Sequence, residues 1–325
     1  MTTDASIIIV NYNAGAHLRR CVACLKAQTV PSFEVFLIDN ASADESLDAA
    51  RAEIAEDRRF TIVELADNTG FAAANNHGAE LTSTPLIVTL NPDAFPEPDW
   101  LETLLAAAVS HPDVAMFGST QLDATQPGRI DGAGDRYFAG GVPWREQNDR
   151  RLKAHANSGI YETFAPCAAA AMYRADAFHA VGGFDPRFFC FVEDVDLGYR
   201  LRRRGHRCLQ VVAARVHHLG GGAGGGTSDF ARYQGTRNLV WCFFKNTPGV
   251  LFPVLAPVHA LVLAVLAAKS ILRGNPGPTL RGIRDGLAGI RNARDEAFGT
   301  KLADGGLANV VKAMDWSPLA YLRRN

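Results

Sequence analysis

One carboxylate in the sequence stands where an apolar segment ends. Asn91-Pro92-Asp93 directly follows the run Leu86–Leu90, which is typical of a buried strand. A lone carboxylate at the mouth of a sheet suits a hard divalent cation that keeps several waters and takes further ligands from substrate phosphates. Mg²⁺ or Mn²⁺ fits this description, whereas a structural zinc ion does not. The alternative interpretation is a plain turn, because this tripeptide is also a good turn former.

A second group of acids stands at the start of an expected helix. Glu193-Asp194-Val195-Asp196 leads into a helix expected over Leu197–Arg204. Acids stabilise a first helical turn for electrostatic reasons alone, so simple capping is the alternative explanation. Phe188, Phe189 and Phe191 come just before these acids, and an apolar wall raises the pKa of a neighbouring carboxylate. Such a carboxylate is suited to general base catalysis, which contributes about 10²- to 10⁴-fold in rate.

Short polar clusters follow four successive expected strands. In open sheets of parallel strands, ligands bind in the crevice beyond the carboxyl ends of the strands. Loops are polar in any case, so a single cluster is weak evidence, but four in register favour a ligand site. The clusters are Asn11-Tyr12-Asn13, Asp39-Asn40-Ala41-Ser42, Asp67-Asn68-Thr69-Gly70 and Asn91-Pro92-Asp93.

The elements that must position these clusters alternate between short β-branched or aromatic runs and longer segments of helical spacing. This alternation predicts an α/β fold, in which helices cover both faces of a mainly parallel sheet. The expected strands are Ser6–Val10, Phe33–Ile38, Phe60–Val63, Leu86–Leu90 and Val114–Phe117, and the expected helices are Ala16–Ala27, Glu45–Ile54, Ala72–Leu81 and Trp100–Ser110.

The periodicity is lost from about Ser119 to Tyr161, where we expect a long loop. It returns with a strand expected over Ala165–Tyr173, a helix over Ala175–Val181 and a strand over Cys208–Val212. His217 and His218 then precede a glycine run, Gly220–Gly226, which is interrupted only by Ala223. This run is either a flexible linker or a lid over a ligand.

Composition excludes several classes of protein. With 325 residues, 47% of them apolar, the chain has enough apolar surface for a sizeable core. The net charge is −1, which gives no global attraction for nucleic acid. The six cysteines are scattered and we discern no secretory leader, so we expect a reducing, cytosolic compartment, with Cys21 and Cys24 as ordinary thiols. The sequence contains no P-loop, no G-x-G-x-x-G after the first strand, no G-x-S-x-G and no H-E-x-x-H.

The C-terminal part has a different character. Val250–Ala268 contains no charged residue, and this length could just span a bilayer. Two internal prolines and basic flanks favour instead a helix that lies in the membrane interface. From Lys269 to Lys301 there are seven Lys or Arg residues against three acids, which suits an anionic surface. The alternative is a buried core helix beside a solvated basic neighbour.

The motifs together carry a family resemblance. Their ordered set, which extends from about residue 5 to residue 245, resembles the family 2 glycosyltransferases of GT-A fold, and especially the bacterial rhamnosyltransferase-like branch. The motifs are Ile7–Asn13, Asp39–Ser42, Asn68–Asn76, Leu90–Asp93, Gly182–Phe189, Glu193–Leu197 and His218 with the glycines after it.

The resemblance implies a pocket for a nucleotide-diphosphate sugar. Asp39 would accept a hydrogen bond from the pyrimidine ring. The other residues implied to bind substrate are Asn11, Tyr12 and Asn13 near the nucleotide, Asn68, Gly70 and Asn75 near the ribose and diphosphate, and Asn91 and Arg237.

The resemblance also implies a metal site and a base. Asp93 matches the last aspartate of the family's D-x-D motif and would hold Mg²⁺ or Mn²⁺, and Asn91 replaces the first aspartate. Asp194 matches the catalytic base, with Glu193 as the second candidate. His218 would be a further ligand of the metal or diphosphate, with the adjacent His217 as the alternative.

The implied reaction is the inverting transfer of one sugar, with dTDP-rhamnose as the expected donor, to a glycan or polyprenyl-diphosphate-linked sugar in cell-surface polysaccharide synthesis. The alternatives are a UDP-hexose donor or a non-catalytic sugar-nucleotide-binding scaffold. A processive synthase is less favoured, because Gln234-Gly235-Thr236-Arg237 is followed by Asn238 where the Q-x-x-R-W motif has Trp.

We expect a GT-A domain over residues 1–245 and a helical, membrane-associating region over residues 246–325. Residues 1–118 would form the nucleotide-binding half and residues 119–245 the acceptor-binding and catalytic half. The protein would then work in the cytoplasm, on the inner face of the cell membrane, without binding nucleic acid.

Overall fold

A ten-stranded mixed sheet forms the centre of the fold in the computed structural model, which describes residues 4–146, 159–220, 228–293 and 303–317. The strand order is β10-β12-β6-β11-β4-β1-β2-β3, with β5 paired to β12 and β7 to β6. The strands are β1 (Ala5–Asn11), β2 (Phe33–Asp39), β3 (Phe60–Glu64), β4 (Leu86–Leu90), β5 (Ala94–Pro96), β6 (Met116–Asp123), β7 (Ile130–Gly132), β10 (Ile160–Glu162), β11 (Ala170–Arg174) and β12 (Cys208–His218), and the separate hairpin is β8 (Asp135–Phe138) with β9 (Val142–Arg145).

Helices cover both faces of the sheet, as expected. Successive strand residues point to opposite faces, so Ile7 and Ile9 of β1 pack in one core and Ile8 packs in the other. The first core is closed by α1 (Ala16–Lys26), α2 (Ser46–Ile54) and α4 (Trp100–Ser110), and the second by α3 (Gly70–Glu80), α5 (Ala175–Ala180) and α6 (Glu193–Arg203).

The expected strands and helices of the N-terminal part are confirmed within two residues at nearly every end. Strands β1, β2, β3 and β4 are mutually parallel where they pair, so their carboxyl ends meet at one edge. The strand expected over Val114–Phe117 instead begins at Met116 and continues to Asp123 as β6.

Two expectations for the middle of the chain are wrong. Residues 119–161 are not one long loop, because they contain β7, β8 and β9 and the start of β10. These strands have only three or four residues, too few to show an alternating pattern. The strand expected over Ala165–Tyr173 begins only at Ala170, where it pairs antiparallel to β4 and β6. Of the glycine run, residues 221–226 lie outside the described residues.

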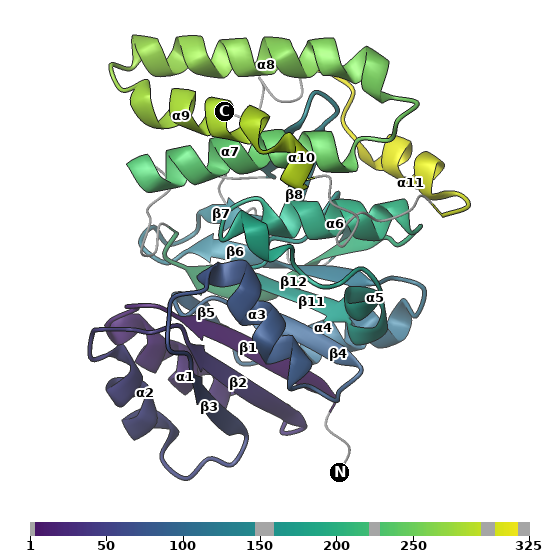
Figure 1. The fold of residues 1–325 in the computed structure, drawn as a ribbon. Coiled ribbons are helices and arrows are strands. Elements are labelled where there is room, and N and C mark those ends of the chain that lie inside the picture. The colour runs from purple at the N-terminus through teal and green to yellow at the C-terminus, as the bar shows by residue number, and fades with distance from the viewer. Residues whose placement is uncertain (1–3, 147–158, 221–227, 294–302, 318–325) are drawn as a thin grey trace.

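Three helices after the sheet stack as a layer above α6, and α8 lies outermost (Figure 1). They are α7 (Asp229–Asn246), α8 (Phe252–Leu272) and α9 (Gly277–Ala288), followed by the short α10 (Ile290–Ala293) and α11 (Gly306–Ala313). Close packing of α9 on α7 requires glycine, since a β-carbon on Gly282 would lie 2.8 Å from the Tyr233 carbonyl oxygen.

Helix α8 contains most of the apolar segment expected over Val250–Ala268. Among the described residues it is the one helix long and apolar enough to cross a membrane. Only four of its side chains are buried, namely Leu255, His259, Leu263 and Ser270. Val254 and Leu261 are 68% and 65% exposed, which does not fit a buried core helix.

Candidate functional site

The ends of β1 and β2 form the first part of the candidate site. Asn11 and Asp39 are opposite each other in the parallel register, and both are buried. The Asn11 side-chain nitrogen donates to Asp39 Oδ1 at 2.7 Å, to Ser42 Oγ at 3.0 Å and to Ser46 Oγ at 2.9 Å. The predicted residues Asn11 and Asp39 therefore lie together, and they fix the turn that leads into α2.

The neighbouring residues Tyr12 and Asn13 are both exposed at this edge. Asn13 has a positive φ of 53° and accepts a hydrogen bond from the backbone nitrogen of Ala43 at 2.7 Å. Both residues directly follow Asn11 and are accessible to a ligand at this edge of the sheet.

The start of α3 forms the next part. Asn40 Nδ2 donates to Asn68 Oδ1 at 2.9 Å, and Asn68 Oδ1 also accepts from the Gly70 nitrogen at 3.0 Å. Asn40 therefore ties the predicted residues Asn68 and Gly70 to the end of β2. Asn75 is buried within α3, and its side-chain nitrogen donates to the Phe71 carbonyl one turn earlier at 2.9 Å. This nitrogen therefore forms a hydrogen bond within the helix.

Asp93 and His218 approach each other because β5 pairs antiparallel with the end of β12, with His218 opposite Ala94. Asp93 Oδ1 lies 3.4 Å from His218 Nε2, and both side chains are buried. His217 points elsewhere, to Glu97 Oε1 at 3.3 Å, and is 42% exposed. Of the two candidate histidines, the structure therefore places His218 beside Asp93.

Asp131 holds the other ring nitrogen of His218. Asp131 Oδ2 lies 2.8 Å from His218 Nδ1 and 2.8 Å from Arg145 Nη1. Burial alone would lower the pKa of His218, but the two carboxylates of Asp131 and Asp93 outweigh it and raise this pKa. Burial would raise the pKa of Asp93, but His218 outweighs burial and lowers it.

This arrangement fits a divalent cation. A histidine whose second nitrogen is held by a carboxylate is the usual arrangement around a metal ligand. Asp93 Oδ1 and His218 Nε2 lie 3.4 Å apart, so one cation could be bound by both. Oxygen and imidazole ligands suit Mn²⁺, and the carboxylate suits Mg²⁺. Asn91, at the end of β4, lies two residues from Asp93 in the same turn.

The acids that open α6 form the other side of the site. Asp194 Oδ2 accepts a hydrogen bond from the Ala168 nitrogen at 3.1 Å, and Oδ1 accepts from the Val195 nitrogen at 2.8 Å. Burial raises the pKa of Asp194 by more than these two hydrogen bonds lower it. Glu193 is buried, and its Oε2 has no hydrogen-bond partner among the described residues. Burial and the neighbouring Asp194 raise the pKa of Glu193.

Sequence reasoning missed two residues that lie beside the predicted Asp194, namely Asp135 and Cys167. Ligand atoms of Asp135, Cys167 and Asp194 all lie within 4.8 Å of one another. Burial, with the nearby Asp194 charge, raises the pKa of Asp135 to about 7, and burial raises that of Cys167 to about 12. With these raised pKa values, Asp135 and Cys167 are suited to holding a proton beside Asp194.

Arg145 joins the two sides. Its Nη1 donates to Asp131 Oδ2 at 2.8 Å and its Nη2 to Cys167 Sγ at 3.0 Å. The guanidinium thus connects the Asp93 and His218 pair to the Asp194 cluster. The signal for Asp131 and Asp135 in the sequence was the motif Asp131-Gly132-Ala133-Gly134-Asp135, which lies in the segment expected to be a loop.

Arg237, a predicted substrate residue, contacts the loop before α6. Its Nη2 donates to the Phe188 carbonyl at 3.0 Å, and its guanidinium lies over the Trp241 ring at 4.4 Å. Phe188 is buried against Trp241, whereas the rings of Phe189 and Phe191 both lie near Phe230 at the start of α7. The three phenylalanines therefore divide between two aromatic partners and do not form one continuous apolar wall.

Comparisons with known proteins give a family match and several relatives. Residues 6–182 match the family model described as Glycosyl transferase family 2. An N-acetylglucosaminyl-diphospho-decaprenol L-rhamnosyltransferase of Mycobacterium tuberculosis is 27% identical over 241 residues, which cover 67% of this chain and 76% of that relative.

Solved structures share the fold. A mannosyltransferase from Pyrobaculum calidifontis, in complex with GDP-Man and Mn²⁺, has a TM-score of 0.54 at 20% identity over 99% of this chain and 79% of its own. GalNAc-T7 with UDP, GalNAc and Mn²⁺ has a TM-score of 0.59 at 18% identity over 74% of this chain and 47% of its own. These likenesses confirm the expected GT-A fold.

Proposed function

Because the chain belongs to glycosyl transferase family 2, we propose that it transfers one sugar, with inversion, from a nucleotide diphosphate to a sugar acceptor. One observation carries the proposal: Arg145 connects the Asp93 and His218 pair, through Asp131, to the cluster that contains Asp194. A single displacement needs a base for the acceptor hydroxyl and positive charge at the leaving diphosphate, and this arrangement provides residues for both.

Asp194 would take the proton of the acceptor hydroxyl. The backbone nitrogens of Ala168 and Val195 fix the orientation of its carboxylate, and its raised pKa strengthens it as a base. Attack from the face opposite the nucleotide inverts the anomeric carbon. Glu193 remains the second candidate.

Asp93 and His218 would hold the cation, and Asp131 would keep the His218 ring in the orientation that leaves Nε2 directed at Asp93. A bound Mg²⁺ or Mn²⁺ would supply positive charge to the departing diphosphate. Arg145 would balance the negative charge that Asp131, Asp135 and Asp194 bring together.

The Asn11 and Asp39 cluster and the Asn68 to Gly70 turn would bind the nucleotide and its diphosphate. The L-rhamnosyltransferase relative supports L-rhamnose as the transferred sugar, and dTDP-rhamnose is the donor that we propose. A UDP-hexose is the alternative, since GalNAc-T7 of the same fold is bound to UDP. The decaprenol-linked acceptor of the rhamnosyltransferase supports a polyprenyl-diphosphate-linked sugar as the acceptor.

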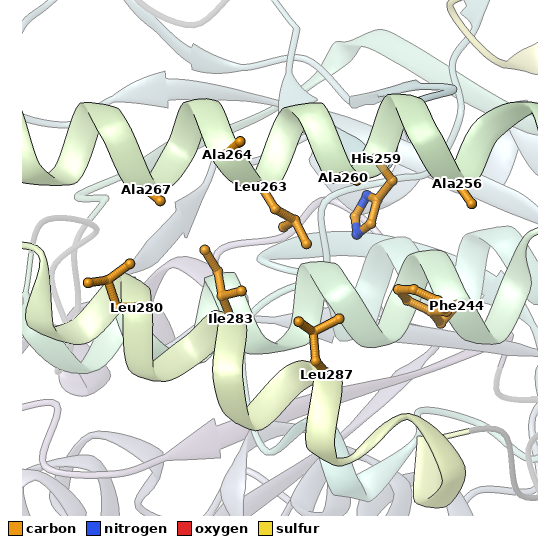
Figure 2. Close-up of a pocket in the computed structure, with 10 residues that line it drawn as sticks. All are labelled: Phe244, Ala256, His259, Ala260, Leu263, Ala264, Ala267, Leu280, Ile283 and Leu287. Atoms are coloured by element: carbon orange, nitrogen blue, oxygen red, sulfur yellow. The ribbon is translucent and has the colours of Figure 1, made fainter.

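Helix α8 would place the enzyme on the cytoplasmic face of the membrane. Besides its exposed apolar side chains, α8 lines an open apolar groove of about 370 Å³ between α8 and α9 (Figure 2). Leu280 and Leu287 of α9 line this groove and are also exposed, at 42% and 45%. Exposed apolar area of this kind is typical of a membrane-binding surface, and the basic residues of α9 suit anionic lipid. Residues 1–245 would then act as the GT-A domain and residues 246–325 as its membrane-associating region.

A thermal-shift titration with dTDP, UDP and GDP, each with and without Mn²⁺, tests the donor site. We expect a metal-dependent rise in melting temperature with one nucleotide, because a ligand that binds only the native state stabilises it, by about 2.7 kcal/mol at 100 times its Kd. Asp93→Ala and His218→Ala should lose the metal-dependent part of this rise. His217→Ala is the matched control and should retain it, since His217 points to Glu97. Absence of a shift with all three nucleotides in the wild type would contradict the proposed nucleotide-sugar site.

Flotation with liposomes tests the membrane surface. We expect the wild-type chain to float with anionic vesicles, and the double variant Val254→Glu, Leu261→Glu to stay in solution, because two charges would enter the apolar surface. Val109→Glu is the control, since Val109 is 82% exposed on α4, on the first core's side of the sheet. Equal flotation of the double variant and the wild type would contradict membrane binding through α8.

A further inference from the structure

The loop that leads into Glu193 has a strained backbone. Phe189, Phe191 and Val192 have φ values of 65°, 69° and 70°, in the left-handed region that residues other than glycine rarely adopt. Val192 is also β-branched, which makes this conformation more costly. Backbone of this kind persists only where surrounding contacts determine it, and it concentrates at functional sites.

A single side chain from α7 supplies three of these contacts. The Asn238 amide nitrogen lies 2.9 Å from the Phe188 carbonyl oxygen, 2.9 Å from that of Cys190 and 2.7 Å from that of Phe191. Asn238 is fully buried, and its own Oδ1 accepts from Arg237 Nε at 2.9 Å. The carboxamide therefore gathers the carbonyls of the strained loop around one point.

The same loop joins the donor side of the site to the base. The Phe189 carbonyl accepts from the Ala72 nitrogen of α3 at 3.1 Å, and a β-carbon on Gly70 would overlap the Phe189 ring. At its other end, the Val192 carbonyl accepts from the Asp196 nitrogen in the first turn of α6 at 2.9 Å. A displacement of this loop would therefore move Asp194 relative to the Gly70 turn.

We propose that Asn238 is a positioning residue, which holds residues 188–192 so that Asp194 keeps a fixed place relative to the bound donor. Asn238 stands at the position where the chain departs from the Q-x-x-R-W motif, and the proposed function gives it no other role. The inference rests on the proposed glycosyl transfer, because the effect concerns the rate of that reaction.

The experiment compares Asn238→Asp and Asn238→Ala with Asn246→Ala. Aspartate has the shape of asparagine but directs oxygen at three carbonyls, and alanine removes the donor. Asn246 is the matched control, because it lies in the same helix, is 1% exposed and donates to Asp196 Oδ1 and the Cys242 carbonyl instead of the loop. Transfer kinetics, nucleotide-induced thermal shift and hydrogen exchange at residues 189–195 are measured for each variant well below its melting temperature.

We expect kcat to fall about tenfold or more in both Asn238 variants, as misplacement of a reacting group does, with the donor KM and the nucleotide-induced shift within about threefold of wild type. Exchange at residues 189–195 should rise in these variants, while Asn246→Ala keeps wild-type kcat and exchange there. If the two variants fold too poorly for kinetics, Asn238→Ser, which retains one donor, is measured instead. Its fall in kcat and its rise in exchange at residues 189–195 should be smaller than those expected for Asn238→Ala.

A wild-type kcat in Asn238→Ala, or a fall no larger than in Asn246→Ala, would overturn the positioning role. A parallel loss of nucleotide binding would overturn it as well, because the role would then be structural. Wild-type protein that transfers no sugar at all would overturn the proposed function itself, which separates the two failures.

Discussion

Replacement of Asp194 by asparagine should lower the rate of sugar transfer by about 10²- to 10⁴-fold, the usual contribution of a general base. Asparagine occupies the same space, and its oxygen can still accept from the Ala168 nitrogen. It cannot take a proton from the acceptor hydroxyl, so the loss should fall on kcat. The nucleotide-induced thermal shift should remain, because the Asn11 and Asp39 cluster lies at the ends of other strands.

Glu193→Gln is the comparison variant for this assignment. Glu193 neighbours Asp194 and has a buried oxygen without a partner among the described residues, so it is the other carboxylate suited to be the base. Near-normal transfer by Asp194→Asn together with loss of transfer by Glu193→Gln would show that Glu193, and not Asp194, is the base.

The wild-type rate should rise with pH through the raised pKa of the base, because only the ionised carboxylate accepts a proton.

Replacement of Lys245 by methionine should lower the free energy of unfolding by about 3 kcal/mol, within the range for breaking a buried ion pair. Lys245 Nζ lies 2.7 Å from Asp185 Oδ2 and 2.9 Å from Asp196 Oδ2, and all three side chains are buried. Methionine fills the space but leaves these carboxylates short of one positive charge. Arg187 still pairs with Asp185 and Arg200 with Asp196, so we expect a loss at the lower end of the range for a broken buried ion pair. Urea unfolding measures the effect.

Lys312→Met is the control for Lys245→Met, because Lys312 is exposed and the same change there should cost less than about 0.5 kcal/mol. Equal losses in the two variants would contradict a stabilising role of the buried network.

The buried network also predicts a pH dependence of stability. Arg187 and Lys245 outweigh burial and lower the pKa of Asp185 from 3.8 to about 2. Its contribution to stability is therefore complete above pH 4 and is lost as the pH falls towards 2.

The ends of the parallel strands show how much of the site could be predicted from the sequence. Alternation and helical spacing are local, so they indicated β1, β2 and β4 and the helices after them with small errors at the ends. Parallel strands place their carboxyl ends at one edge, and this rule was enough to bring Asn11 to Asp39 and to place Asp93 at the mouth of the sheet.

Residues in short or antiparallel strands could not be placed in this way. Asp131, Asp135 and Arg145 belong to or border strands of three or four residues, whose sequence has no period to detect. Their role depends on which distant segments pair. Asp131 contacts His218 across 87 positions of sequence, and no local pattern encodes such a contact.

The sequence by itself determined the α/β class, the order of the elements, the family resemblance and the type of residue at each strand end, because each of these depends on neighbours along the chain. Only the tertiary structure decided that His218 rather than His217 faces Asp93, since adjacent strand residues point to opposite faces and the pairing of β12 with β5 selects one. It also decided that Arg145 connects the two sides of the site and that Asn238 holds the loop before Asp194. These contacts join segments tens of residues apart, and only packing of the whole chain brings them together.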